Sequence, residues 1–393
     1  MNTSLLTHDV TLTVGLLEAF RSRAPEHDRD GRYPTDDLDD LRAIGWLGAA
    51  APVELGGLGL NLVQLARAQR RLARYAPSTA LSTCMHHYWV GLASDLRRFG
   101  LPAGTRILEW VSAGEVLASG HGEAGNDVPV SLSTARAERV TGGWRIQGRK
   151  MFGSLGPVWD RIGIHAMDTS DPAAPVVVHG FVHRTAPGVT VVPTWDAQGM
   201  RATESHDTVL DGVFIADADV LCVVPAGPSN DPAVGGMLVW ALTLISNVYL
   251  GIAERALEIA VAHAIERTSI AIPHGTYAHH PLVQHQVASM YLELDSARAT
   301  VERLAQDWVD NVDHGGRWPI QVLSAKWRAA TASMRVVDLA CEVVGGGSFR
   351  RGHELERLSR DVRAARFHPG TDAFAHEAIG KALLDVDPSG PRW

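Results

Sequence analysis

Cysteine and lysine are both scarce in this sequence of 393 residues. The three cysteines, Cys84, Cys222 and Cys341, stand far apart and are odd in number. They form no closely spaced pair of metal ligands, so we interpret them as reduced thiols in the core of a protein from a reducing compartment. Only three lysines stand against 33 arginines, which we read as a property of a GC-rich coding sequence and not as a sign of function.

Other absences exclude whole classes of protein. The formal charge is -8 and the arginines are spread along the chain, so no nucleic-acid partner is expected. No window approaches eighteen consecutive apolar residues, so no membrane partner is expected. Residues 1–10 lack a basic start followed by an apolar run, which predicts no export signal and a cytoplasmic protein. His279, His280 and His285 have no cysteine or carboxylate at metal-ligand spacing, so no metal is expected.

The periodicity of the sequence changes twice. Helical spacing dominates residues 1–114, short β-branched segments dominate 115–230, and longer helical patterns return in 231–393. Within the middle part, Thr141-Gly142-Gly143 predicts a hairpin turn. Many short strands without intervening helices predict an antiparallel barrel or sandwich. The runs that read as strands are 161–167, 176–183, 188–192 and 208–215.

The C-terminal part carries two long apolar stripes. One follows three–four spacing from Met290 to Trp308, and the other does so from Ile320 to Cys341. Such stripes are typical of long helices in an up-down bundle. The sequence therefore predicts an α+β protein with an N-terminal helical domain, a middle β domain and a C-terminal helical bundle.

Several short motifs follow the order of one family over nearly the whole chain. They resemble the acyl-CoA dehydrogenases, and the resemblance implies that family's fold and a flavin cofactor, FAD. The motifs are Ile44-Gly45-Trp46-Leu47, the segment from Ala51 to Gly59, Gly125-Asn126-Asp127, the segment from Gly148 to Ser154, Gly199-Met200-Arg201-Ala202-Thr203, Asp211-Gly212-Val213-Phe214-Ile215, Gly251 with Arg267, Gly345-Gly346-Gly347, Glu356-Arg357 through Arg360-Asp361, and Gly370-Thr371.

The resemblance also implies residues that bind the flavin. Phe152 and Ser154 would face the flavin from the end of a strand. Arg267 would reach the pyrophosphate of a flavin bound by a neighbouring subunit, which makes the protein a homo-oligomer, either a dimer or a tetramer. An arginine can form a forked contact with a pyrophosphate, and glycines let a backbone approach it closely. The remaining predicted cofactor contacts are Gly345, Gly346 and Thr371.

The chain departs from the family at the catalytic base. Dehydrogenation of an acyl thioester requires a base within reach of the α-proton. The usual glutamate position is occupied by Pro369, and the alternative position used by a minority of the family is Ala241. The carboxylate nearest to the site in sequence is Glu123, which is either a displaced base or an ordinary loop residue.

Histidines stand close to these gaps. His368 precedes Pro369, and His86 and His87 lie on the helix before the middle domain. Together with Ser154 they resemble the flavin monooxygenase branch of the same fold, such as dibenzothiophene monooxygenase, in which such groups surround a peroxyflavin. Imidazole can donate or accept a proton near neutral pH. This alternative uses reduced FMN or FAD delivered by a partner reductase.

The sequence leaves several functions open. The first is an FAD-dependent oxidoreductase that acts on an acyl-CoA-like or other small organic substrate, served by a flavin reductase or an electron-transfer partner. The second is the reduced-flavin monooxygenase. A third is an inactive flavin-binding subunit of a hetero-oligomer, and a fourth is a helical scaffold without flavin. The sequence does not identify the substrate.

Overall fold

The computed structural model describes residues 12–128, 130–272 and 275–387. The expected absence of an export signal concerns residues 1–10, which lie outside the described residues. The N-terminal part is helical, and two short 3-10 turns, η2 (Trp46–Gly48) and η3 (Val53–Leu55), separate its second and third helices. These helices are α2 (Val14–Asp30), α3 (Thr35–Ala43), α4 (Leu62–Ala73), α5 (Pro77–Arg98) and α6 (Pro102–Ser112).

The middle part forms one eight-stranded sheet in the order β6-β7-β3-β2-β4-β5-β8, with β1 paired to β4. The predicted turn at Gly142 joins β2 and β3 in an antiparallel hairpin. The sheet is mixed, because β1 and β2 each pair with β4 in parallel. The strands are β1 (Leu117–Gly120), β2 (Arg136–Val140), β3 (Gly143–Gly153), β4 (Arg161–Asp168), β5 (Val176–His183), β6 (Val189–Val192), β7 (His206–Ala216) and β8 (Val220–Pro225).

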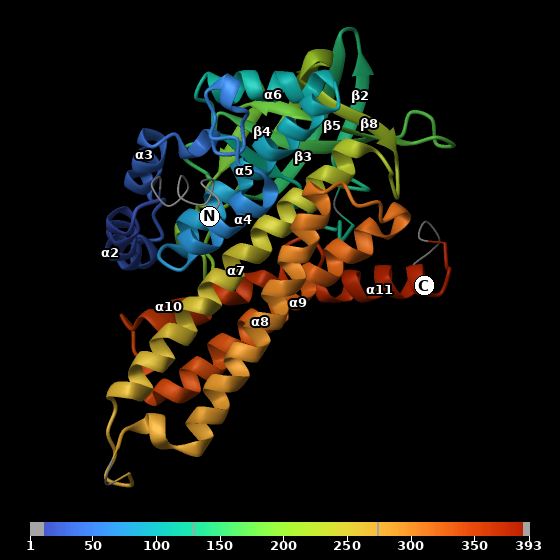
Figure 1. The fold of residues 1–393 in the computed structure, drawn as a ribbon. Coiled ribbons are helices and arrows are strands. Elements are labelled where there is room, and N and C mark those ends of the chain that lie inside the picture. The colour runs from blue at the N-terminus through green and yellow to red at the C-terminus, as the bar shows by residue number, and fades with distance from the viewer. Residues whose placement is uncertain (1–11, 129, 273–274, 388–393) are drawn as a thin grey trace.

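Three long helices make up most of the C-terminal part, and they extend away from the sheet side by side (Figure 1). Both predicted apolar stripes lie on these helices, the first on α8 and the second on α9. Two shorter helices, α10 and α11, follow. The bounds are α7 (Pro232–Glu266), α8 (Pro281–Val309), α9 (Trp318–Val344), α10 (Glu354–Asp361) and α11 (Asp372–Leu383).

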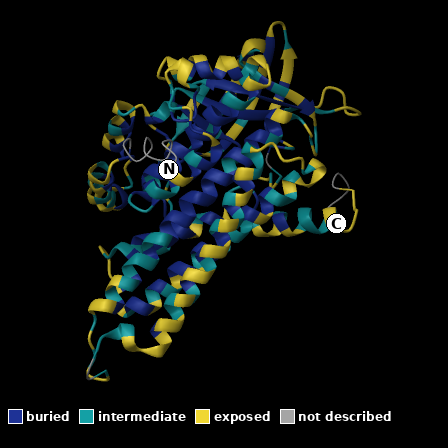
Figure 2. Cartoon of the chain, viewed as in Figure 1, coloured by how far each residue is buried: buried dark blue, intermediate teal, exposed yellow. Residues whose placement is uncertain are grey.

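Helix α7 is the central helix of the molecule. It is long and apolar enough to cross a membrane, but 89% of its most apolar window is buried inside the protein. A helix that is apolar on all sides and covered by other elements belongs to a protein core. Figure 2 shows its first half in dark blue, enclosed by neighbouring helices.

Helix α5 is packed between the sheet and the bundle. On the sheet side, a Cβ added at Gly163 of β4 would lie 2.2 Å from the Trp89 ring. On the bundle side, a Cβ added at Gly91 would lie 2.3 Å from the Trp240 ring of α7. Glycine at both positions permits close packing of large aromatic rings. The middle of α5 therefore lies where the three parts of the fold meet.

Candidate active site

His368 lies in the turn before α11, and its ring contacts α7. The Tyr249 hydroxyl and His368 Nε2 are 2.6 Å apart. Burial, and secondly the charge of Lys326, lowers the pKa of His368 to about 3. Burial also raises the pKa of Tyr249 well above its ordinary value, so both groups are neutral. A protonated phenol against a neutral imidazole forms a hydrogen bond in either imidazole tautomer.

The adjacent residues His86 and His87 of α5 have different environments. The Leu117 N–H donates to His86 Nδ1 at 3.0 Å, so His86 Nε2 carries the hydrogen that it donates to the Leu47 carbonyl at 2.8 Å. Both nitrogens of His86 are therefore occupied by backbone groups. The His87 ring is fully buried, and within the described chain neither of its nitrogens has a hydrogen-bond partner. Its ring contacts the edge of Trp46 at 5.3 Å between centroids.

An unpartnered polar ring inside a protein requires an explanation, because buried polar groups are normally hydrogen-bonded. The indole Nε1 of Trp46 is also buried and lacks a partner in the described chain. His87 and Trp46 thus bring three unused nitrogens together at the junction of η2 and α5. These three nitrogens can bind a polar ligand or a water molecule. His86, in contrast, links α5 to η2 and β1 through its two hydrogen bonds.

Ser154 directly follows strand β3. Its hydroxyl is 2.7 Å from the Ser205 hydroxyl, which is 2.7 Å from that of Thr203. The Thr203 hydroxyl donates to the Met200 carbonyl at 2.9 Å. Phe152 stands two residues earlier with a φ of +62° and a 57% exposed ring. This backbone conformation is unfavourable for an aromatic residue and presents the ring outward.

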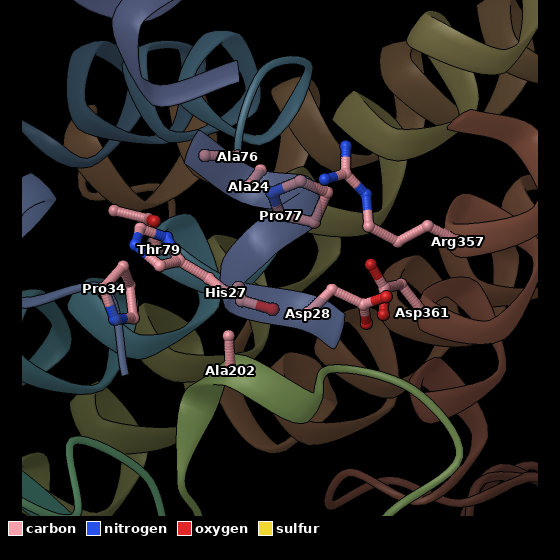
Figure 3. A pocket seen from close by; sticks show the side chains of 11 residues that line it. Ala24, His27, Asp28, Pro34, Ala76, Pro77, Thr79, Ala202, Arg357 and Asp361 are labelled. Atoms are coloured by element: carbon pink, nitrogen blue, oxygen red, sulfur yellow. The ribbon is translucent and has the colours of Figure 1, made fainter. Parts of the chain in front are cut away.

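A small cavity lies between α2, the start of α5 and α10. It measures about 10 Å³, room for a single water molecule. The Met200 N–H donates to the buried Asp361 carboxyl at 2.5 Å. Figure 3 shows Arg357 and Asp361 of α10 on the same side of the cavity, with Asp28 of α2 beside them. Burial raises the pKa of Asp361 to about 6. The loop before β7, which carries Met200, Thr203 and Ser205, is thereby fixed to α10. Helix α10 leads through a short 3-10 segment, η9 (Val362–Arg366), to His368.

Glu123 is a structural carboxylate. It forms a fully buried ion pair with Lys150, and Ser133 Oγ and the Thr134 N–H donate to it at 2.6 and 2.9 Å. Burial alone would raise its pKa, but the Lys150 charge and these hydrogen bonds hold the pKa below its ordinary value. A carboxylate with its lone pairs occupied is not free to take a substrate proton. Its position as a displaced base is therefore not supported.

The predicted phosphate contacts lie at the opposite end of the bundle. Arg267 ends α7, its Nη1 donates to the Val344 carbonyl at 3.1 Å, and its guanidinium covers the Tyr277 ring. A Cβ at Gly345, which has a φ of +73°, would lie 3.5 Å from Arg267 Nη1. The structure thus brings Arg267 and Gly345 together, and Gly346 follows with open space around it.

The two groups of candidate cofactor contacts are far apart within one chain. Arg267 lies 18 residues after Tyr249 on the same helix, which corresponds to about 27 Å along its axis. Thr371 belongs to the His368 end, where it caps α11 by accepting from the Phe374 N–H at 3.4 Å. Arg267 therefore lies well away from Thr371, another predicted cofactor contact, within the same subunit.

A larger open cleft of about 430 Å³ lies between α4, α7 and α8, apart from all these residues. Its arginines are largely paired with its acids. Arg70 lies 3.3 Å from Glu254, and Arg74 forms an ion pair with Glu258. Five arginines and three carboxylates line the cleft, and none of the predicted catalytic residues is among them.

Sequence reasoning missed Tyr249, Ser205 and Lys326 at this site. Tyr249 is one residue in an apolar helix, and no local motif marks it. Lys326 had a usable signal, because it is a charged residue three positions after Leu323 and four before Ala330, on the face of the apolar stripe. Ser205 had no signal, because its partner lies 51 residues away.

Comparison with known proteins identifies the family. Residues 16–105 match the N-terminal domain and residues 236–384 the C-terminal domain of acyl-CoA dehydrogenase. L-evernosamine nitrososynthase of a Micromonospora species is 30% identical over 96% of this chain and 90% of its own length. Putative acyl-CoA dehydrogenase YdbM of Bacillus subtilis is 30% identical over 94% of each chain. The chain belongs to the acyl-CoA dehydrogenase family, and it is a flavin-dependent enzyme, as predicted.

Among solved structures, KijD3 in complex with FMN and dTDP-3-amino-2,3,6-trideoxy-4-keto-3-methyl-D-glucose superimposes with a TM-score of 0.82. It is 28% identical, and the match covers 99% of this chain and 96% of that one. The residues present here fit a flavin. Phe152 offers an exposed aromatic face, Ser154 offers a hydroxyl, and buried His87 has unused ring nitrogens.

Proposed function

We propose that this chain is a reduced-flavin-dependent monooxygenase that oxidises the amino group of a sugar carried on a nucleoside diphosphate. The observation that carries the proposal is the neutral pair of His368 and Tyr249, which stands where dehydrogenases of the family place a carboxylate. Pro369 offers no proton acceptor in its side chain, and neither does Ala241. Glu123 is occupied by Lys150.

A neutral pair suits the oxidation of an amine better than the removal of an α-proton. An amine must be unprotonated to attack an electrophilic oxygen, and a fixed negative charge beside it would favour its ammonium form. The neutral imidazole of His368 leaves the amine uncharged and can hold a hydrogen at Nδ1 or accept one there, depending on its tautomer. Tyr249 fixes the ring through Nε2.

The other residues take binding roles. His87 offers two unpartnered nitrogens to a polar group in the buried space beside Trp46. Ser154 and the exposed Phe152 would hold the flavin ring, with Thr371 near the His368 turn. A bound reduced flavin supplies two electrons and, with molecular oxygen, the oxygen atom that the substrate nitrogen receives. A partner reductase would provide the reduced flavin.

The distribution of contacts supports a homo-oligomer. Arg267 and Gly345 form a small cationic, glycine-lined surface about 27 Å along α7 from Tyr249. A guanidinium there can bind the pyrophosphate of FAD only if another subunit holds the rest of that cofactor. In this arrangement each complete site is built from two chains.

Two relatives support the substrate class. The Micromonospora relative is named for an amino sugar, and the KijD3 complex contains a nucleotide-linked amino sugar with FMN. YdbM is named as a putative acyl-CoA dehydrogenase. Oxygenation is favoured over dehydrogenation by the missing base as well as by these relatives.

The test uses the purified protein with a reductase that regenerates reduced FMN or FAD, isotopically labelled oxygen gas and a thymidine-diphosphate amino sugar. We expect labelled oxygen on the sugar nitrogen, and we expect His368→Ala to abolish the product while flavin affinity is retained. Anaerobic bleaching of oxidised flavin by an acyl-CoA, with formation of the 2,3-enoyl-CoA, would overturn the proposal. Bound flavin with no turnover, together with co-purification of a homologous chain, would instead identify an inactive subunit.

A further inference from the structure

The turn that carries His368 is packed between two helices. A Cβ added at Gly370 would lie 2.9 Å from Leu323 of α9 and 3.7 Å from Leu242 of α7. Leu242 and Tyr249 are seven residues apart, about two helical turns, so both present the same face of α7 to the turn. The ring of His368 therefore depends on how this turn is seated between α7 and α9.

Lys326 of α9 holds the turn through its backbone. Lys326 is only 3% exposed. Its ammonium donates to the Gly370 carbonyl at 3.0 Å and to the His368 carbonyl at 3.4 Å. These two carbonyls lie on either side of Pro369. Proline has no N–H with which to anchor itself, so the lysine replaces the backbone donor that the turn lacks.

The charge of Lys326 has no close counter-ion in the described chain. The Asp372 carboxylate of α11 raises the pKa of Lys326 from a distance but is bonded to Trp327 Nε1 at 2.6 Å. Burial is the larger effect and lowers the pKa of Lys326 to about 8. The groups that face His368 are therefore Tyr249 from α7 and Lys326 from α9, with Asp361 beyond the phenol.

We propose that Lys326 is a positioning residue for His368. Its ammonium fixes the two peptide groups around Pro369, which keeps the imidazole against Tyr249, and its positive charge disfavours a second positive charge on the ring. It acts through the backbone and the local field, without contact with substrate. The expected effect on kcat rests on the proposed function, whereas the expected effect on the pKa of the His368 ring does not.

The experiment separates these two parts with Lys326→Met and Lys326→Gln. Lys326→Met removes the donors and the charge, whereas Lys326→Gln retains a neutral donor. The ionisation of His368 is followed by nuclear magnetic resonance of isotope-labelled histidine, with the signal assigned by its loss in His368→Gln. Lys381→Met on α11 is the matched control, because this lysine forms a helix-surface ion pair with Glu377 at 3.0 Å.

Both variants are expected to raise the pKa of His368, and Lys381→Met is expected to leave it unchanged. In Lys326→Met, kcat should fall at least about tenfold with KM nearly constant, because misplacing a catalytic group by about 1 Å can cost about 10²-fold. Lys326→Gln should recover part of that turnover. An unchanged pKa of His368 in folded Lys326→Gln would overturn the electrostatic part, and unchanged kcat in Lys326→Met would overturn the positioning part. If amine oxidation itself fails, the shift in the resonance still tests the effect on the ring.

Discussion

Tyr249 and His368 are 119 residues apart in the sequence, yet their side chains meet at 2.6 Å across the groove between α7 and the turn before α11. The contact joins the central helix of the protein to the position where relatives with dehydrogenase activity place their base. Because both groups are neutral, the pair can orient a hydrogen without itself carrying a buried charge.

Replacing Tyr249 with phenylalanine tests the importance of this contact. We expect Tyr249→Phe to lower kcat, because His368 loses the partner that orients its ring, and to cost about 1 kcal/mol of stability. Tyr88→Phe is the matched control, since the Tyr88 hydroxyl donates to Ser119 at the same 2.6 Å elsewhere. Steady-state kinetics and urea denaturation of both variants should show equal stability losses but a kinetic defect only in Tyr249→Phe. Equal kinetics would remove Tyr249 from the site.

The neighbours His86 and His87 should respond in opposite ways to phenylalanine. His86→Phe leaves the Leu117 N–H and the Leu47 carbonyl unpaired, each at about 1–3 kcal/mol. His87→Phe removes two unpartnered nitrogens and should leave the free energy of unfolding nearly unchanged or higher. It should nevertheless weaken substrate binding or turnover. Denaturation and kinetics check both variants, and a large stability loss in His87→Phe would show that its nitrogens are satisfied in solution.

Arg267 should link cofactor binding to assembly. We expect Arg267→Ala to lower FAD affinity and loosen the oligomer together, because the guanidinium would bind the pyrophosphate held by another subunit. Flavin fluorescence titration and light scattering measure the two effects. Arg298→Ala on α8 serves as the control, because this arginine pairs with Asp295 of the same helix. Unchanged flavin content and unchanged size would contradict this role.

Acid should destabilise the protein between about pH 6.5 and pH 4. Burial lowers the pKa of His86 and His179 to about 4 and that of His368 to about 3. Below the ordinary pKa of 6.5 the unfolded chain binds protons that the folded chain does not, so stability falls as the pH falls. Each such histidine contributes about 1.4 kcal/mol per pH unit in this range. Burial also lowers the pKa of His87, His121 and His165 well below its ordinary value.

Calorimetry in buffers of different ionisation enthalpy can count these protons. Unfolding at pH 5 should take up several protons per chain, whereas unfolding at pH 8 should take up none from histidine. A melting temperature that is flat from pH 6.5 to pH 4 would show that the buried rings ionise freely in the folded protein.

The sequence predicted those features that are encoded locally. Gly142 lies in the hairpin where the turn motif placed it, and the stripe from Met290 forms a buried face of α8. Of the stripe from Ile320, Leu323, Ala330 and Val337 are buried on α9. Strand pairing is not local, so nothing in the sequence of β1 indicated its parallel pairing with β4.

Residues of the candidate site could be predicted from the sequence only where they belong to a recognisable motif. Ser154 and His368 follow from the family pattern, but their partners Ser205 and Tyr249 come from distant segments that only the fold brings near. The different environments of His86 and His87 could not be predicted either. Whether a ring nitrogen finds a backbone partner depends on where η2 and β1 pass α5.

Helix α7 is attached at two points, through Tyr249 to the turn before α11 and through Arg267 to the Val344 carbonyl at the end of α9. Deleting one residue between these points would rotate one relative to the other by about 100° and shift it by about 1.5 Å. One of the two attachments would then be lost, even though every side chain that forms them would still be present. The stretch from Tyr249 to Arg267 should therefore accept no change of length, and gaps in it should be far rarer than gaps in the loops on either side of the bundle.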